Sequence, residues 1–107
     1  MQRGEKILYQ YIGGGTYSGW VLRGVINAFV SNERFVARIL WSHVALVDIP
    51  VAAIRHVRPG TWWWYRTVEI AYETDGRERL IELSTSRRAQ SEMLSAFRSV
   101  GARVVAS

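Results

Sequence analysis

The chain has 107 residues and a mass of 12.2 kDa, which is the size of one domain with a single hydrophobic core. Hydrophobic residues make up 49% and charged residues 21%, which excludes a disordered chain, and the absence of cysteine excludes disulfides and thiolate metal sites. The 14 basic and nine acidic side chains give a net charge of +5, and every basic residue except Lys6 is an arginine. Arginine suits anionic partners such as phosphates, although a preference for arginine over lysine also follows from genome base composition.

The sequence also bears on membranes and export. No apolar run approaches the roughly 18 residues that a membrane-spanning helix needs. The first residues, MQRGEK, lead into ILYQYI and do not have the pattern of a signal peptide. We therefore expect a soluble cytoplasmic protein, in which any membrane association is peripheral and at the inner face.

The first half of the chain predicts short β-strands. Residues 5–12 are rich in β-forming side chains and end at three consecutive glycines, residues 13–15, which we interpret as a flexible or tight connection between strands. Two apolar runs within residues 25–41 flank the sequence SNER, which is the pattern of a β-hairpin. In its second arm arginines alternate with apolar residues, as in a half-buried strand, and residues 45–50 predict a further strand that ends at a proline.

The second half predicts one more hairpin and a single helix. After the strand-like residues 51–57 and a Pro-Gly break, residues 67–83 alternate polar and apolar side chains around Asp75-Gly76, a dipeptide suited to the positive φ of a two-residue loop. Within residues 86–100 apolar side chains recur at spacings of three and four, which predicts an amphipathic helix that ends before a glycine. The expected fold class is therefore mainly β, with six or seven antiparallel strands followed by one C-terminal α-helix.

This order and its landmarks resemble the bacterial pleckstrin-homology-like and GRAM-like domains. The segment GVINAFVSNERFVARILW looks like the family's glycine, apolar strand, Thr/Ser-Asn-x-Arg turn and second apolar strand. DIPVAAIRHV is similar to its Asp-Ile-Pro segment, ETDGRERLIEL to its Asp-Gly hairpin and the last helix to its closing helix, so that the resemblance covers residues 5–101. It implies a single pleckstrin-homology-like domain, residues 1–107, in which two roughly orthogonal sheets form an open barrel capped by the helix.

The resemblance does not extend to the phosphoinositide site of the lipid-binding members. Those members use a lysine late in the first strand and an Arg/Lys-x-Arg in the second, whereas this chain offers Lys6, a run of glycines and Arg23. We therefore do not expect phosphoinositide binding by that route. Bacterial members commonly look like homo-oligomeric or membrane-associated modules, and the resemblance implies both properties for this chain.

The most unusual stretch is PGTWWWYRT, residues 59–67, in which three tryptophans and a tyrosine follow a Pro-Gly break. Because successive strand side chains point to opposite faces, Trp62 and Trp64 can share a core if the stretch is a single strand. Trp63 and Tyr65 must then face elsewhere. Three interpretations are open: the rings serve internal packing, they form a protein interface, or they lie in a lipid headgroup layer.

A basic window surrounds these aromatics, because no acidic residue lies between Asp48 and Glu69. The candidate residues for binding a ligand or partner are the cations and aromatics within it: Arg55, Arg58, Trp62, Trp63, Trp64, Tyr65 and Arg66. An enzyme is not expected, since the chain offers only His43 and His56 as histidines, no cysteine nucleophile and no carboxylate pair at a motif spacing. We infer no catalytic residue, metal, cofactor or small-molecule substrate.

These features predict a non-catalytic binding or assembly module that engages an anionic membrane surface or a protein partner through the Arg/Trp-rich loop. A homo-oligomer is expected, because a second copy would cover the surplus aromatic surface. The alternative is a single-stranded nucleic-acid-binding protein, since aromatic side chains beside cations can stack bases and track phosphates. A net charge of +5 without clustered lysines and arginines is a small electrostatic footprint for that alternative.

Overall fold

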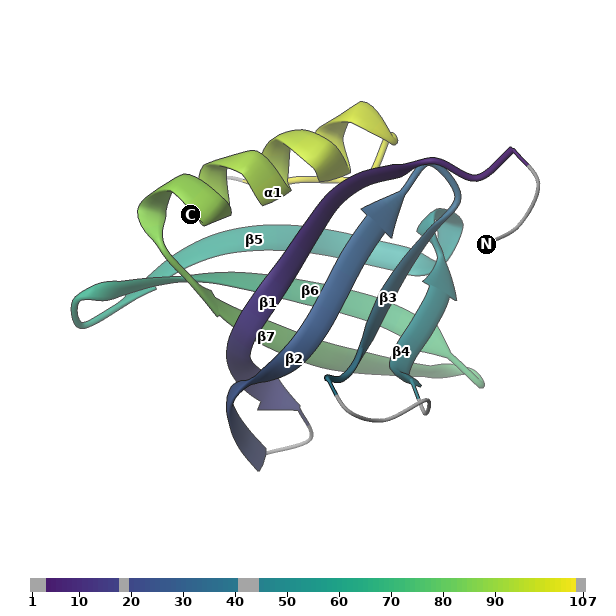
Figure 1. Cartoon of the computed structure of the whole chain (residues 1–107). Helices are drawn as coiled ribbons and strands as arrows, with labels where there is room; N and C mark the ends of the chain where they lie inside the picture. The colour runs from purple at the N-terminus through teal and green to yellow at the C-terminus, as the bar shows by residue number, and fades with distance from the viewer. Residues whose placement is uncertain (1–3, 18–19, 41–44, 106–107) are drawn as a thin grey trace.

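The computed structural model describes residues 4–17, 20–40 and 45–105, and for residues 20–25 and residue 62 it describes the backbone only. The elements, drawn in Figure 1, are β1 (Ile7–Tyr17), β2 (Trp20–Ser31), β3 (Arg34–Ile39), β4 (Ala45–Pro50), the 3-10 turn η1 (Val51–Ala53), β5 (Ile54–Trp62), β6 (Tyr65–Thr74), β7 (Arg77–Thr85) and α1 (Arg87–Ser99). A mainly β chain that ends in one helix is therefore confirmed. The predicted turns at SNER and at Asp75-Gly76 are confirmed as well, because they join β2 to β3 and β6 to β7.

All seven strands belong to one sheet, in the order β4-β3-β2-β1-β7-β6-β5, and every neighbouring pair is antiparallel. Strand β1 joins the two halves of this sheet, because Gly14–Tyr17 pair with β7 while most of the same strand pairs with β2. In Figure 1 strands β1–β4 pass in front of β5–β7 at a steep angle, and α1 lies across one end. The expected division into two sheets is not confirmed, since hydrogen bonds through β1 keep all the strands in a single open sheet.

The expectation that residues 13–15 form a connection is wrong, because all three glycines lie inside β1. Gly15 faces β7, where an added Cβ would collide with the backbone carbonyl oxygen of Glu82. Gly13 lies under the ring of Tyr11, whose hydroxyl donates a hydrogen bond to a carbonyl oxygen of β7. The glycines thus let β1 approach β7 closely, and local sequence could not reveal this because the hydrogen-bonded partners are 73 residues apart.

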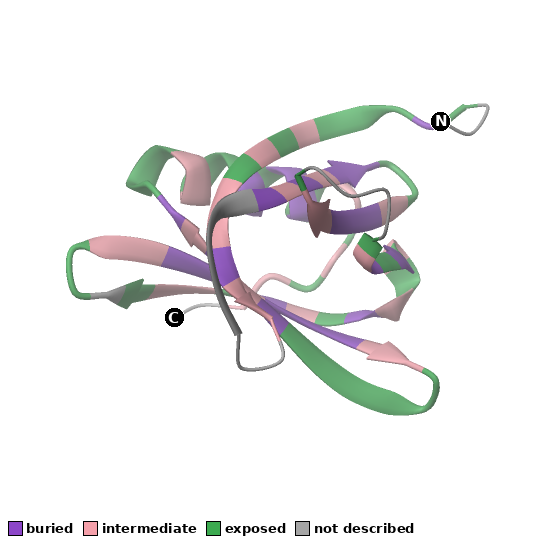
Figure 2. Cartoon of the chain, turned by 60° about the horizontal axis from the view of Figure 1, so that its bottom comes forward, coloured by how far each residue is buried: buried purple, intermediate pink, exposed green. Residues whose placement is uncertain are grey.

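The hydrophobic core lies between the two halves of the sheet and beneath α1. Its largest fully buried side chains come from both halves and from the helix: Ile26, Val30, Phe35, Val57, Val68, Ile70, Tyr72, Ile81, Leu83, Met93 and Phe97. The rings of Phe35 and Phe97 lie 5.6 Å apart, so the helix packs directly against β3, and the hydroxyl of Ser86 caps the helix by accepting a hydrogen bond from the amide of Ala89. Figure 2 shows buried and exposed bands along the strands, as expected where one face covers a core. The predicted amphipathic helix is therefore confirmed, and its apolar face, which includes Met93 and Phe97, lies in the core.

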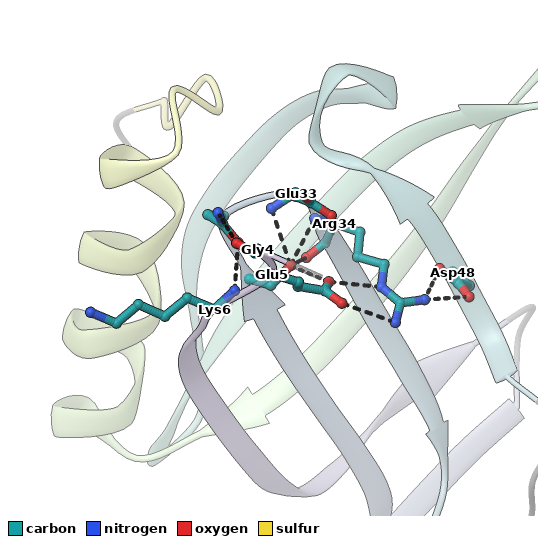
Figure 3. Close-up of polar contacts among 8 residues, drawn as sticks. Gly4, Glu5, Lys6, Glu33, Arg34 and Asp48 are labelled. Atoms are coloured by element: carbon teal, nitrogen blue, oxygen red, sulfur yellow. Dashed lines mark hydrogen bonds and ion pairs between the residues drawn. The ribbon is translucent and has the colours of Figure 1, made fainter. Parts of the chain in front are cut away.

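A buried ion pair fastens the start of the described chain to the β2–β3 turn (Figure 3). The Glu5 side chain is 0% exposed, and its carboxylate accepts hydrogen bonds from Arg34 Nε at 2.8 Å and from Arg34 Nη2 at 3.2 Å. The Ser31 hydroxyl donates to the same carboxylate at 2.6 Å, and Asp48 of β4 accepts from Arg34 Nη1 at 3.1 Å. The hydrogen bond to Glu5 is the main cause that raises the pKa of Arg34, so the guanidinium stays charged.

Candidate functional site

The aromatic stretch forms the tip of the hairpin that joins β5 to β6. Trp62 pairs with Tyr65 across the two strands, which leaves Trp63 and Trp64 as a two-residue loop. Trp63 has a φ of 55°, in the left-handed region that costs an ordinary residue roughly 1–2 kcal/mol and that bulky side chains rarely adopt. Turn chemistry does not account for tryptophan at this position, because asparagine or glycine forms such a loop with less strain.

We refer to Trp63, Trp64 and Tyr65 together as the Trp tip. Trp63 and Trp64 are 70% and 86% exposed. Their ring centroids lie 5.8 Å apart in an edge-on arrangement, and the rings of Trp64 and Tyr65 meet edge-on at 6.4 Å. The β5–β6 hairpin extends beyond the rest of the sheet in Figure 1, and the exposed rings of Trp63 and Trp64 meet at its tip.

The interpretation in which Trp62 and Trp64 share a core is wrong for Trp64, which is 86% exposed. Side chains alternate between faces only while a chain is extended, and this chain reverses direction at Trp63 and Trp64. Tyr65, expected on the outward face, is half-buried at the start of β6. The side chain of Trp62 lies outside the described part of the structure, so its expected burial stays a prediction.

Two of the candidate arginines lie away from the Trp tip and are paired. Arg58 and Arg55 precede Trp62 on β5 by four and seven residues, which is about 13 and 23 Å along an extended strand. Arg58 Nη1 lies 3.8 Å from a carboxylate oxygen of Glu69, and Arg55 pairs with Glu73. The basic residues of this acid-free part of the sequence are therefore paired with glutamates of the neighbouring strand β6.

Arg66 is the candidate cation that stays beside the Trp tip. Its Nη1 donates to the Thr61 hydroxyl at 3.0 Å, and in the sheet it lies between Thr61 of β5 and Thr85 of β7. Strand alternation places Arg66 on the face of β6 that carries the buried Val68, which is the face that α1 covers. Arg58 lies on the opposite face, so the structure separates two arginines that the sequence suggested as one cluster.

Two further cations near Arg66 were not among the candidates. Because Thr85 lies opposite Arg66 and α1 starts two residues later, the exposed Arg87 and Arg88 follow at the first turn of the helix. The side-chain amide of Gln90 holds this turn on the hairpin by donating to two carbonyl oxygens of β5 and β6, at 2.9 and 2.8 Å. A helix N-terminus disfavours cations, and no acid stands in this first turn. An Arg-Arg pair directly after a serine N-cap is the sequence signal that could have identified them.

The face of the hairpin opposite α1 is acidic. An open groove of about 400 Å³ on this hairpin is lined by residues that include Arg58, Glu69 and Glu82. Glu69 and Glu82 lie directly opposite each other on β6 and β7, and burial, followed by the charge of Glu69, raises the pKa of Glu82. His56 Nε2 lies 3.6 Å from Glu69. Arg66 and the first turn of α1, which carries Arg87 and Arg88, therefore lie on one side of the hairpin, while carboxylates dominate the other side.

Helix α1 is neither long enough nor apolar enough to cross a membrane. Across residues 4–17, 20–40 and 45–105, no three side chains of the metal-binding types are grouped so that they could hold an ion. The Trp tip, with the cations behind it, is therefore the candidate site with the clearest chemistry. Comparison with protein-family models and with curated proteins finds no match for this chain.

Proposed function

We propose that this chain is a non-catalytic docking module of the pleckstrin-homology-like type, which binds anionic membrane surfaces through the Trp tip. The observation that carries the proposal is the exposure of Trp63 and Trp64, 70% and 86%, on a loop with a strained backbone. Strain of this kind persists where another demand outweighs local stability, and it clusters at functional sites. Seven antiparallel strands followed by a helix support the pleckstrin-homology-like part, in which the two halves of the sheet would correspond to the two sheets of the barrel.

A bilayer surface suits the chemistry of the Trp tip. Tryptophan and tyrosine rings combine an apolar body with a polar edge, and they are enriched where hydrocarbon meets headgroups. Arg66 and Arg87 lie on the α1 side of the hairpin, and each cation near an anionic leaflet is worth roughly 1 kcal/mol of attraction. Arg88 adds less, because its Nε lies 3.7 Å from a carboxylate oxygen of Glu92. Arg55 and Arg58 add less, because glutamates already match their charges.

Vesicle flotation tests the aromatic part of the proposal. The protein should float with phosphatidylcholine vesicles that contain phosphatidylglycerol and stay unbound with phosphatidylcholine alone. Combining Trp63→Ala with Trp64→Ala should weaken binding more than tenfold, since burying one large apolar side chain is worth roughly 1.5–3 kcal/mol. Leu80→Ala is the matched control, because Leu80 is 50% exposed on another strand. A parent protein that floats with neither vesicle, or a double variant that floats like the parent, contradicts the proposal.

Charge reversal tests the electrostatic part. Arg66→Glu combined with Arg87→Glu should weaken binding more than tenfold at low salt, and the difference should shrink at high salt because ions screen exposed charges. The control is Arg77→Glu with Arg79→Glu, which makes the same change of charge at the β6–β7 turn, the other end of β6. Equal losses in both variants would show that net charge drives binding and would contradict the placement of the site.

Single-stranded nucleic acid is a second candidate, because exposed aromatic rings beside arginines also stack bases. The rings of the Trp tip meet at interplanar angles of 75° and 77°, so they do not offer parallel faces to consecutive bases, and this favours the membrane. Competition separates the two: oligothymidine should leave the vesicle-bound protein in place. Release by oligothymidine, with no release by excess vesicles of protein bound to oligothymidine, would favour nucleic acid.

The homo-oligomer expected from the sequence remains a proposal of its own. A second copy that covered Trp63 and Trp64 would remove both rings from water, which is the usual fate of a large exposed apolar patch. Light scattering should then give a dimer for the parent protein and a monomer for the variant in which both are alanine. If the parent protein is monomeric at high concentration, a dimer that covers Trp63 and Trp64 is ruled out, and the bilayer remains the proposed contact of the Trp tip.

A further inference from the structure

The hydroxyl of Thr85, at the junction between β7 and α1, has no hydrogen-bond partner among the described residues. Thr85 is 4% exposed, so bulk water does not supply the missing partner. Buried polar groups are normally hydrogen-bonded, and an exception needs a physical explanation. Thr85 follows Ile81 and Leu83 on the core-facing side of β7, so its side chain points to the side on which α1 begins.

The first turn of α1 leaves two main-chain donors free beside this hydroxyl. The Ser86 hydroxyl caps the amide of Ala89, and the Ser86 carbonyl oxygen accepts from the amide of Gln90. The amides of Arg87 and Arg88 have no intrahelical acceptor, and no other group in the described part of the chain accepts from them. Since Ser86 and Arg87 are exposed, a ligand in solution can reach these amides.

Arg66 brings a cation to the same place. It lies directly opposite Thr85 in the sheet, and the Cβ atoms of such a pair are about 4.5–5.5 Å apart. One guanidinium nitrogen donates to Thr61 on the far side from β7. Within residues 4–17, 20–40 and 45–105 no acid pairs with Arg66 or Arg87, whereas Arg58 has such a partner. Two cations without acids therefore flank the unsatisfied hydroxyl and amides.

The chemistry of this junction is that of an anion site. A helix N-terminus carries a partial positive charge, and its free amides bind phosphate groups readily. An arginine guanidinium matches two oxygens of a phosphate at once, and the tetrahedral group has further oxygens for the amides and the hydroxyl. The positive charges of Arg87 and Arg88 oppose the helix dipole, and a phosphate placed between them would offset that repulsion.

We propose that Arg66, the Thr85 hydroxyl and the first turn of α1 form a binding site for a phosphate group. The amides of Arg87 and Arg88 donate to the phosphate oxygens at the open side of the site. The Thr85 hydroxyl is shielded from solvent, so we place it at the inner end, where it donates to the phosphate when Arg66 turns from Thr61 towards the anion.

The phosphate can belong to a lipid headgroup or to a soluble phosphate ester. Figure 1 shows that α1 starts on the side of the molecule to which the β5–β6 hairpin points, so a headgroup beside the Trp tip could reach the site. The headgroup source rests on the proposed membrane function, whereas a soluble ester needs no membrane. Both sources share the same contacts, and the experiments below separate them.

Titration of the whole protein with inorganic phosphate tests the site directly. Nuclear magnetic resonance should show saturable shifts of the Arg87 and Arg88 amides, which sodium chloride at equal ionic strength does not produce. Thr85→Val should weaken phosphate binding about tenfold, because it removes a hydrogen bond to a charged group. It should not lower the melting temperature in phosphate-free buffer, since the hydroxyl has no partner among the described residues. Thr74→Val, at the other end of β6, is the matched control and should bind like the parent.

The guanidinium has a matched pair of its own. Arg66→Gln should weaken phosphate binding about tenfold, because it removes a charge-assisted contact. Arg79→Gln makes the same change of charge towards the other end of β7 and should leave binding unchanged. Phosphate that shifts no more resonances than chloride does, or that binds Thr85→Val as tightly as the parent, would overturn the proposal.

Vesicle competition assigns the source of the phosphate. If it is a headgroup, glycerol phosphate should release the parent protein from phosphatidylcholine vesicles that contain phosphatidic acid, and Thr85→Val should bind these vesicles more weakly. If parent and variant bind the vesicles equally while the phosphate titration separates them, the ligand is a soluble ester. A protein that binds phosphate but no vesicle contradicts only the membrane function, and one that binds vesicles but no phosphate contradicts only this phosphate site.

Discussion

Two hairpin turns of this molecule are built in opposite ways. At the β2–β3 turn, Ser31 and Arg34 bind the buried carboxylate of Glu5, so the polar atoms of the turn serve the fold. At the β5–β6 turn, Trp63 and Trp64 place large apolar rings in solvent on a backbone with a positive φ. The first turn is explained by contacts within the chain. The second opposes local stability, so its residues point to a contact outside the chain.

The turn at the other end of β6 sharpens this contrast. It is also a two-residue loop, and it uses Asp75 and Gly76 at φ values of 52° and 74°. These residue types adopt such angles with little strain, unlike the tryptophan at position 63. Strand β6 therefore has a different kind of loop at each end. The residues of the β6–β7 loop suit a positive φ, and Trp63 of the β5–β6 loop does not.

The largest expected effect is at the β2–β3 turn. Arg34→Ala should lower the free energy of unfolding by about 3–5 kcal/mol, because it takes the bidentate partner from a buried carboxylate. Urea denaturation measures this effect. Arg38→Ala, a half-buried arginine on the same strand, should cost less than about 1 kcal/mol. Equal losses at the two positions would show that the Glu5 network does not fasten the turn.

The next largest effect is a gain in the free energy of unfolding, and it is expected at the Trp tip. Replacing Trp63→Gly together with Trp64→Asn should raise the free energy of unfolding by about 1 kcal/mol, because glycine at position 63 relieves the positive φ, and should abolish vesicle binding. Gly76→Ala is the mirror experiment at the suitable loop and should destabilise by about 1 kcal/mol. Thermal melts measure the stability of both variants, and a destabilised Gly-Asn variant would mean that the tryptophans serve the fold.

The smallest expected effect on stability is at Glu82 of β7, which lies opposite Glu69 of β6. Burial, and then repulsion from Glu69, raise the pKa of Glu82, so the fold disfavours its ionised form. Such a group contributes most stability at low pH, where it is protonated, and that contribution is lost as pH rises through the raised pKa. Glu82→Gln should therefore stabilise the protein at pH 7 by less than about 1 kcal/mol, because solvent screens the half-exposed carboxylate. Urea melts should show no gain at pH 3, and a gain that persists there would exclude charge as its cause.

The parts of the fold that could be predicted are those set by nearby residues. The alternation around Asp75-Gly76 and the three-and-four spacing that buries Met93 and Phe97 are local patterns, and both elements form where expected. Gly13 and Gly15 were misread because their role depends on β7, far along the chain. The same limit explains the single sheet, since the pairing of β1 with β7 is not encoded in either strand alone.

The candidate site was predictable in its residue types but not in its arrangement. The row of aromatics located the Trp tip, yet the period of two, which would allow Trp64 a place in the core, does not hold where the chain turns. Arg55 and Arg58 looked free because their glutamates come from the next strand, and register decides that pairing. Arg87 was missed because only the pairing of β7 with β6 brings the start of α1 close to Arg66.

The pairing of β1 with β7 also has a consequence for synthesis. Gly14 and Ser84 are partners near the middle of the sheet, although 70 residues separate them in sequence. At a translation rate of roughly 5–20 residues per second, about 4–14 s pass between the emergence of these two residues from the ribosome. Until then, the core face of β2 and β3, with Ile26 and Phe35, has nothing to pack against. The nascent half-sheet must stay soluble through that interval, and a transcript truncated before β7 would yield a chain that cannot complete its core.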